Sequence, residues 1–278
     1  MTSFSRTIHS VFAAAALSAT VSGAVWAQGA DSLIDQAMVG SHRADTNKAR
    51  DKYRHPRETL LFFGIKPDMT VVEITPGRGW YTEILAPVLR DRGEYYAAVF
   101  PINEKSPDFA KQNDAFYRGM LSGNPELYGK VKLSVMTPPA VEVAPAGSAD
   151  MVLTFRNVHN WAKAGSADAM FKGFYDALKP GGVLGVIDHR AKAGTSFQRQ
   201  IDSGYMTEAY VIEAAQKAGF KLDGKSEINA NPKDTADHPG GVWNLPPNLR
   251  GVADADKSKY LAIGESDRMT LKFVKPGT

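Results

Sequence analysis

Cysteine is absent from the 278 residues of this chain. Its absence excludes disulfides, thiolate metal sites and a cysteine nucleophile, and a protein without thiols suits an oxidising compartment. An excess of one charge is also missing, because 33 basic residues are interspersed with 30 acidic ones and the formal net charge is only +3. Without a basic run, the sequence predicts no nucleic-acid partner.

Long apolar runs are missing as well. The apolar stretch 11–21 is shorter than the roughly 20 residues that cross a bilayer as a helix, so it is too short for a membrane anchor. Arg6 and His9 precede this stretch, and small residues suited to cleavage follow it up to Ala27. This order predicts a Sec-type signal peptide over 1–27, a periplasmic or secreted mature protein, and no membrane span after cleavage.

The mature chain divides into two parts. Residues 28–54 are polar and charged, and Leu33 with Ile34 indicates one short amphipathic helix that caps the domain. Residues 55–278 form the domain itself, and the hydrophobic content of 43% suffices for one full-sized core. Within the domain, 229–266 holds many prolines and glycines with almost no periodicity. We interpret this segment as a long loop insertion, packed through Trp243.

From Lys66 onward, β-branched segments alternate with amphipathic ones. This alternation is typical of a sheet made mostly of parallel strands. Between the second and third strands, we expect a helix over 106–121 whose buried side carries Phe109, Phe116 and Met120. The expected strands are 71–75, 94–100, 130–136, 150–155, 182–188, 220–227 and 269–274.

The strongest local signal is the stretch Glu73-Ile74-Thr75-Pro76-Gly77-Arg78-Gly79-Trp80-Tyr81-Thr82. A strand that ends in glycines and turns at once into a helix lets the backbone approach a ligand closely and points helix N–H groups at it. The acidic residue at the strand end, Glu73, can orient the loop or a polar ligand. The plainer alternative is that the two glycines serve only the turn.

This stretch resembles the nucleotide-binding loop of class I S-adenosylmethionine-dependent methyltransferases, where an acidic residue precedes three alternating glycines. Leu178-Lys179-Pro180-Gly181-Gly182 is similar to the turn before the fifth strand of that superfamily. More narrowly, the run from Arg57 through Gly64-Ile65-Lys66-Pro67 to Thr82 is similar to a group of predicted exported bacterial methyltransferases. The resemblance implies a Rossmann-like class I methyltransferase fold, an α/β fold with a mostly parallel seven-stranded sheet and helices on both faces. It also implies S-adenosylmethionine as cofactor.

The resemblance carries over to individual positions with three departures, the first of which is Thr75 in place of the first glycine. No acid ends the second strand at Val99-Phe100-Pro101 to bind the ribose, where Glu104 is the nearest candidate, and no acid or amide follows the third strand at Met136-Thr137-Pro138-Pro139. The implied cofactor-binding residues are Glu73 at the acidic position, Thr75 in place of the first glycine, Gly77 and Gly79 as the second and third, Tyr81 beside the cofactor, and Asn157.

Two polar clusters follow the fourth and fifth expected strands. The first, Phe155-Arg156-Asn157-Val158-His159-Asn160-Trp161, contains a histidine, the residue type whose ordinary pKa suits a general base. The alternative for this histidine is a half-buried packing pair with Trp161. The second, Asp188-His189-Arg190, lies at the same sheet edge, where Asp188 can fix a tautomer and Arg190 can hold an acidic acceptor or a carboxylate of the cofactor. The predicted catalytic residues are His159, Asp188 and His189.

The same residue types can also bind a divalent metal. His159 and His189 would combine with Asp188 or Glu73, and His238 would be a third imidazole. Because the spacing fits no specific metal motif, no metal is predicted.

These features together predict transfer of a methyl group from S-adenosylmethionine to a small-molecule acceptor outside the cytoplasm. The alternative is a non-catalytic periplasmic ligand- or metal-binding protein that retains the methyltransferase fold, because the cofactor is made in the cytoplasm and the strand end at Phe100 lacks an acid. Ser203-Gly204 and Gly147-Ser148 lack the nucleophile turn of hydrolases. A dinucleotide-binding loop requires a third glycine where Thr82 stands.

Overall fold

The structure is a computed structural model that describes residue 1 and residues 29–277. The predicted signal peptide, 1–27, lies outside the described residues apart from Met1. No described helix is both long enough and apolar enough to cross a bilayer.

One seven-stranded sheet organises the chain, with the strand order β3-β2-β1-β4-β5-β7-β6. Its strands are β1 (Thr70–Ile74), β2 (Glu94–Val99), β3 (Lys132–Val135), β4 (Ala149–Phe155), β5 (Leu178–His189), β6 (Lys221–Ser226) and β7 (Arg268–Val274). The first five strands pair in parallel, whereas β7 is antiparallel to both β5 and β6. The predicted mostly parallel α/β sheet is therefore confirmed. Because parallel strands end at one edge, the segments that follow β1, β2, β3, β4 and β5 meet there.

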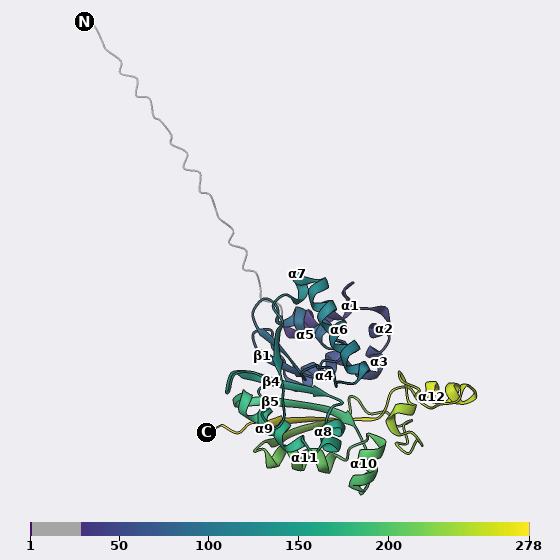
Figure 1. The fold of residues 1–278 in the computed structure, drawn as a ribbon. Helices are drawn as coiled ribbons and strands as arrows, with labels where there is room; N and C mark the ends of the chain where they lie inside the picture. Colours follow the sequence, from purple (N-terminus) through teal and green to yellow (C-terminus); the bar gives the residue numbers. More distant parts are fainter. Residues whose placement is uncertain (2–28, 278) are drawn as a thin grey trace.

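Helices cover both faces of this sheet (Figure 1). One face carries α1 (Ala30–Val39), α4 (Pro56–Phe63), α5 (Thr82–Leu89), α6 (Asp108–Gly123) and α7 (Pro125–Tyr128), and the other carries α8 (Val158–Ala164), α9 (Ala167–Ala177), α10 (Phe197–Ser203) and α11 (Glu208–Lys217). Neighbouring residues of β1 serve opposite cores, since Val71 packs with Leu60 and Ile84 while Val72 packs with Phe171 and Phe174. The two-residue period of a strand thus supplies two apolar layers.

The N-terminal extension forms three helices, not the single one predicted. α2 (Asp45–Lys48) and α3 (Asp51–Arg54) follow α1. Such short helices have too little apolar period for a pattern to reveal them. Polar contacts hold them instead: Arg43 donates to Asp51 at 2.7 Å, and the Trp80 indole donates to the Asn47 carbonyl at 3.0 Å. Since α1 packs on α5, the extension covers the domain as a cap.

The predicted buried face of α6 is wrong for Phe109 and Phe116, whereas Met120 is half-buried against the core as predicted. Phe109 is 69% exposed and Phe116 is 46% exposed, whereas Tyr117 is buried against α5 and β2. The Arg78 guanidinium lies 3.6 Å from the centre of the Phe116 ring, which gives this exposed aromatic a cation–π contact. The side of α6 that faces the protein includes the polar Asn113. The positions of the aromatic residues alone therefore predicted the wrong face.

The segment 229–266 is packed, and it contains more regular structure than its composition indicated. It forms η1 (Gly241–Asn244), η2 (Asp254–Asp256) and α12 (Lys257–Ile263). Val242 and Leu245 are buried, and Trp243 contacts Gly204 so closely that an added Cβ there would lie 3.0 Å from the indole. The Tyr205 hydroxyl donates to the buried Asp234 at 2.9 Å, which anchors the segment to the domain.

Candidate active site at the carboxyl edge of the sheet

The loop between β1 and α5 turns through three left-handed residues at alternating positions: Thr75 (φ 53°), Gly77 (φ 62°) and Gly79 (φ 84°). Glycine adopts such angles freely, whereas a β-branched residue is strained there by roughly 1–3 kcal/mol. Thr75 therefore keeps the glycine-like conformation of the position that the resemblance assigns to it. Strain of this kind is found most often at functional sites.

A cavity of about 600 Å³ opens beside this loop. Thr75 and Gly77 line it from the loop, Phe100 lines it just beyond β2, and Asn157 and Trp161 line it from the segment after β4. The cavity thus lies at the carboxyl ends of the parallel strands, which is where open α/β sheets bind ligands.

The two glycines of the loop have different tasks. A Cβ added to Gly77 would have no atom within 4 Å, so this glycine leaves open space at the cavity wall. A Cβ added to Gly79 would lie 2.5 Å from the Met120 side chain, so that glycine makes room for α6. The Thr75 hydroxyl is buried at the cavity wall without a hydrogen-bond partner among the described residues. An open cradle and an orphaned hydroxyl on one loop fit a polar ligand that approaches the backbone.

The acid that lines the cavity comes from a helix and not from a strand end. Glu104, the candidate nearest the end of β2, is exposed and does not line the cavity. Asp114 of α6 does line it and pairs with Arg118 at 2.9 Å. Sequence reasoning missed Asp114 because it looked for the acid at the end of the second strand and not on the helix that follows.

Glu73 lies behind the loop and is only 2% exposed. Its carboxylate accepts hydrogen bonds from the Tyr95 hydroxyl and, at 3.1 Å, from the Thr82 hydroxyl, which ties β1 to β2 and α5. Burial raises the pKa of Glu73 to about 7 against the effect of these bonds. Glu73 therefore orients the loop from behind, and its direct contact with a cofactor stays a prediction.

Tyr81 and Asn157 brace the same wall. The Tyr81 ring stacks on Phe155 with centroids 3.6 Å apart and planes 10° apart, and burial raises the pKa of its phenol to about 12. The Asn157 amide donates to the Ile74 carbonyl at 2.9 Å and to the Thr154 hydroxyl at 3.1 Å. Asn157 thus joins the ends of β1 and β4 while it lines the cavity. Cofactor contacts of both residues stay predictions.

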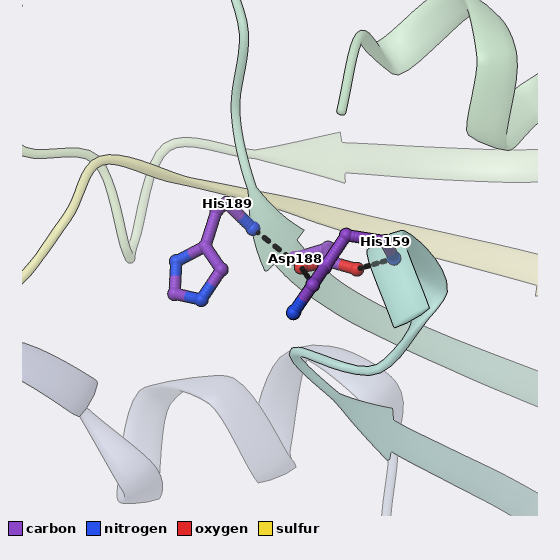
Figure 2. Close-up of side chains that lie close together, drawn as sticks. All are labelled: His159, Asp188 and His189. Atoms are coloured by element: carbon purple, nitrogen blue, oxygen red, sulfur yellow. Dashed lines mark hydrogen bonds and ion pairs between the residues drawn. The ribbon is translucent and has the colours of Figure 1, made fainter. Parts of the chain in front are cut away.

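His159, Asp188 and His189 meet at the same sheet edge (Figure 2). His159 Nδ1 lies 3.0 Å from Asp188 Oδ1, and the backbone N–H groups of His159 and His189 donate to the two oxygens of Asp188 at 3.2 and 2.8 Å. His159 belongs to the first turn of α8. Their catalytic roles stay predictions.

These contacts set the protonation of the histidines. A carboxylate only accepts hydrogen bonds, so Asp188 places the proton of His159 on Nδ1 and leaves Nε2 free to accept. The His189 ring lies 5.3 Å from that of His159, and its Nδ1 lies 2.5 Å from the Ser266 hydroxyl. Burial, then His159 and nearby arginines, hold the pKa of His189 well below its ordinary value, so this ring is neutral.

Three further expectations for this edge are wrong. Arg190 is not available for an acidic acceptor, because Asp267, Glu208 and Glu227 already pair with it. His238 is no third imidazole of the cluster, because its Nε2 lies 2.8 Å from Asp234. Glu73 does not join either, since it faces Tyr95 and Thr82. Among the described residues, only His159, Asp188 and His189 bring possible metal-binding atoms together there, within 4.8 Å.

Sequence reasoning missed the arginines beside these histidines. Arg54 and Arg268 are each 2% exposed, and their charges, with that of Arg156, lower the pKa of His189. Arg156 carried a signal, because it directly follows β4 in a polar cluster. Arg54 and Arg268 carried none, since they come from the extension and from the start of the last strand.

The fold of this chain is similar to those of known proteins. Neither protein-family models nor the sequences of curated proteins match this chain. Solved structures do: a SAM-dependent methyltransferase from Aquifex aeolicus has 16% sequence identity and a TM-score of 0.50, over 88% of this chain and 98% of that one. The carbon methyltransferase CurJ has 12% identity and a TM-score of 0.50, over 85% of this chain and 57% of that one.

A third similar structure is an enzyme that is named for a different activity. The 4+2 cyclase SpnF has 17% identity and a TM-score of 0.54, over 86% of each chain. Likeness at this identity concerns the fold, because one fold hosts many reactions. With its strand order and its antiparallel β7, the chain has the Rossmann-like fold of class I methyltransferases.

Proposed function

We propose that the protein transfers a methyl group from S-adenosylmethionine to a small acceptor. The observation that carries the proposal is the cavity beside the β1–α5 loop, at the strand ends of a class I methyltransferase fold. The open space at Gly77 and the orphaned hydroxyl of Thr75 supply a cradle for a polar ligand.

The cavity residues fit the parts of this cofactor. Thr75, Gly77 and Asn157 would hold its polar amino-acid end, and Phe100 with Trp161 would cover an aromatic base. Asp114 would accept hydrogen bonds from hydroxyl groups, in the role that an acid after β2 usually has. When bound, S-adenosylmethionine supplies an electrophilic methyl group on a positively charged sulfur.

His159 would act on the acceptor. Its Nδ1–H is held by Asp188, so the free Nε2 can take a proton from an acceptor hydroxyl, thiol or amine as that group becomes a nucleophile. The Asp188 carboxylate would then stabilise the imidazolium, as the acid does in other Asp–His pairs. Proximity and orientation supply the remainder of the rate enhancement.

Titration calorimetry of residues 28–278 with S-adenosylmethionine and S-adenosylhomocysteine tests the proposal. Gly77→Val should abolish binding, because its side chain enters the open space of the cradle. Gly147→Val is the matched control: Gly147 has φ 64° against 62° for Gly77, equally open space around a Cβ, and lies before β4 at the opposite edge. Equal affinities of the two variants, or no heat from the wild type at millimolar ligand, would contradict the proposal.

The proposed compartment is the periplasm or the exterior, and it rests on the signal-like residues 1–27 and the similarity to exported methyltransferases. Fractionation of cells that express the full chain, with mass spectrometry of the mature N-terminus, tests it. Cleavage after Ala27 is expected, and an uncleaved chain in the cytoplasm would contradict it.

The second candidate is a ligand-binding protein without the reaction, favoured by the acid-free strand end at Phe100. Binding of the cofactor without methyl transfer to any member of an acceptor library would support this candidate.

A further inference from the structure

Four arginines gather around one carboxylate at the edge of the sheet, next to the histidines. Glu265 accepts from Arg50 at 2.6 Å and from Arg54 at 3.2 Å, and it also pairs with Arg268. The fourth, Arg156, is close enough for its charge to act on Arg54 and Glu265. We call Arg50, Arg54, Arg156, Arg268 and Glu265 the arginine cluster.

Positive charge is in excess in this cluster. Among the described residues, Glu265 is the only carboxylate that bonds any of its arginines. Arg54, Arg268 and Glu265 are at most 4% exposed, so water screens their charges weakly. Burying a charge without a partner costs free energy. The excess of positive charge therefore favours an anion that shares the site.

Arg156 is the member of the cluster without a partner among residues 29–277. Its guanidinium forms no hydrogen bond or ion pair with another described residue, although the side chain is only partly exposed. Its backbone has φ 63°, a strained angle for a residue other than glycine, directly after β4. Burial and the charge of Arg268 lower the pKa of Arg156 to about 10, and the guanidinium stays charged at neutral pH. Arg156 therefore combines a strained backbone with guanidinium N–H groups that donate to no other described residue.

The arginine cluster adjoins the proposed base. The charges of Arg54, Arg156 and Arg268 act on His189, whose ring lies 5.3 Å from that of His159. They also oppose a divalent cation at the histidines, because like charges repel strongly where water is excluded. An anion in the same space would be attracted.

We propose that Arg156, assisted by Arg54 and Arg268, binds the carboxylate or phosphate group of an anionic small acceptor beside His159. This inference rests on the proposed function, since it names the class of acceptor. Guanidinium groups bind such oxyanions through paired, charge-assisted hydrogen bonds, which fixes the orientation as well as the affinity. The acceptor atom would then face the free Nε2 of His159.

The test measures anion binding without the cofactor, so that its failure is separable from failure of methyl transfer. Thermal unfolding of residues 28–278 is followed in sodium phosphate, sodium acetate and sodium chloride at equal ionic strength and neutral pH. Phosphate or acetate should raise the midpoint above that in chloride, and whichever acts more strongly identifies the oxyanion. An equal response to all three salts overturns the proposal.

Arg156→Gln and Arg190→Gln are the matched variants, one arginine without a partner and one with three acidic partners. Arg156→Gln should weaken oxyanion binding about tenfold or more. It should also raise the midpoint in chloride, because it removes an uncompensated charge, a change that a merely structural arginine would not produce. Arg190→Gln should lower the midpoint and keep the oxyanion response. An unchanged response in Arg156→Gln overturns the proposal.

The cofactor also has a carboxylate, so a competition experiment separates the two sources. If the arginine cluster serves the acceptor, the oxyanion binds with the same affinity when S-adenosylhomocysteine saturates the protein. Mutual exclusion of the two ligands overturns the assignment to the acceptor.

Discussion

Two regions at one edge of the sheet differ sharply in charge. The cavity beside β1 and β2 is walled mainly by apolar and neutral groups, whereas the arginine cluster beside β4, β5 and β7 concentrates buried charge. Each region has a buried glutamate, and their pKa values shift in opposite directions. Burial raises that of Glu73, while the charges of Arg268, Arg54 and Arg50 outweigh burial and hold that of Glu265 well below its ordinary range.

One short segment belongs to both regions. Asn157 lines the cavity, whereas its neighbour Arg156 belongs to the arginine cluster. His159, two residues after Asn157, forms a hydrogen bond with Asp188. This division suits the proposed reaction with two ligands, the cofactor on the first side and an anionic acceptor on the second. Replacing side chains in the cavity and in the arginine cluster tests this division.

The largest effect is expected from Glu265→Gln. This change leaves Arg54 and Arg268 buried without a counter-charge, and we expect a loss of about 3–5 kcal/mol in the free energy of unfolding. Urea denaturation at neutral pH measures it. Adding Arg156→Gln to this variant should recover part of the loss, and absence of any recovery would show that Arg156 is not coupled to the cluster.

A smaller effect concerns Glu73. Because its folded-state pKa is raised to about 7, the folded state holds this proton more tightly than the unfolded state. The protonated carboxyl carries no penalty below the unfolded value near 4.5, and stability is lost as pH rises from there through about 7, by roughly 3 kcal/mol. Glu73→Gln should therefore match the wild type in acid and exceed it in mild alkali, as measured by urea denaturation across pH. A constant difference between the two proteins at every pH would rule this out.

The smallest effect on stability is expected from Phe109→Ala. Phe109 lines the cavity but is 69% exposed, so its loss should change the free energy of unfolding by no more than about 0.5 kcal/mol. Binding of S-adenosylmethionine should nevertheless weaken, because the ring forms part of the cavity wall. Phe197→Ala, a 50% exposed residue that does not line the cavity, serves as control for both measurements. Equal affinities in the two variants would separate α6 from the ligand site.

The sequence pattern predicted the sheet and part of the site. The sequence predicted all seven strands, and strand-end placement brought His159, Asp188 and His189 together in expectation as in the structure. The pattern failed for α2 and α3, which polar contacts hold, and for α6, whose inward face mixes polar and apolar residues.

The sequence by itself determined where each strand and turn begins along the chain, and which loop carries alternating glycine-like positions. These are local properties, set by side-chain period and backbone freedom. Only the tertiary structure decided that Arg50, Arg54 and Arg268 share the Glu265 carboxylate close to Arg156, while Arg190 is fully occupied by three acidic partners. The ion pairs of Arg50 and Arg54 with Glu265 join residues more than 200 positions apart, and they depend on burial and distance, which no local pattern encodes.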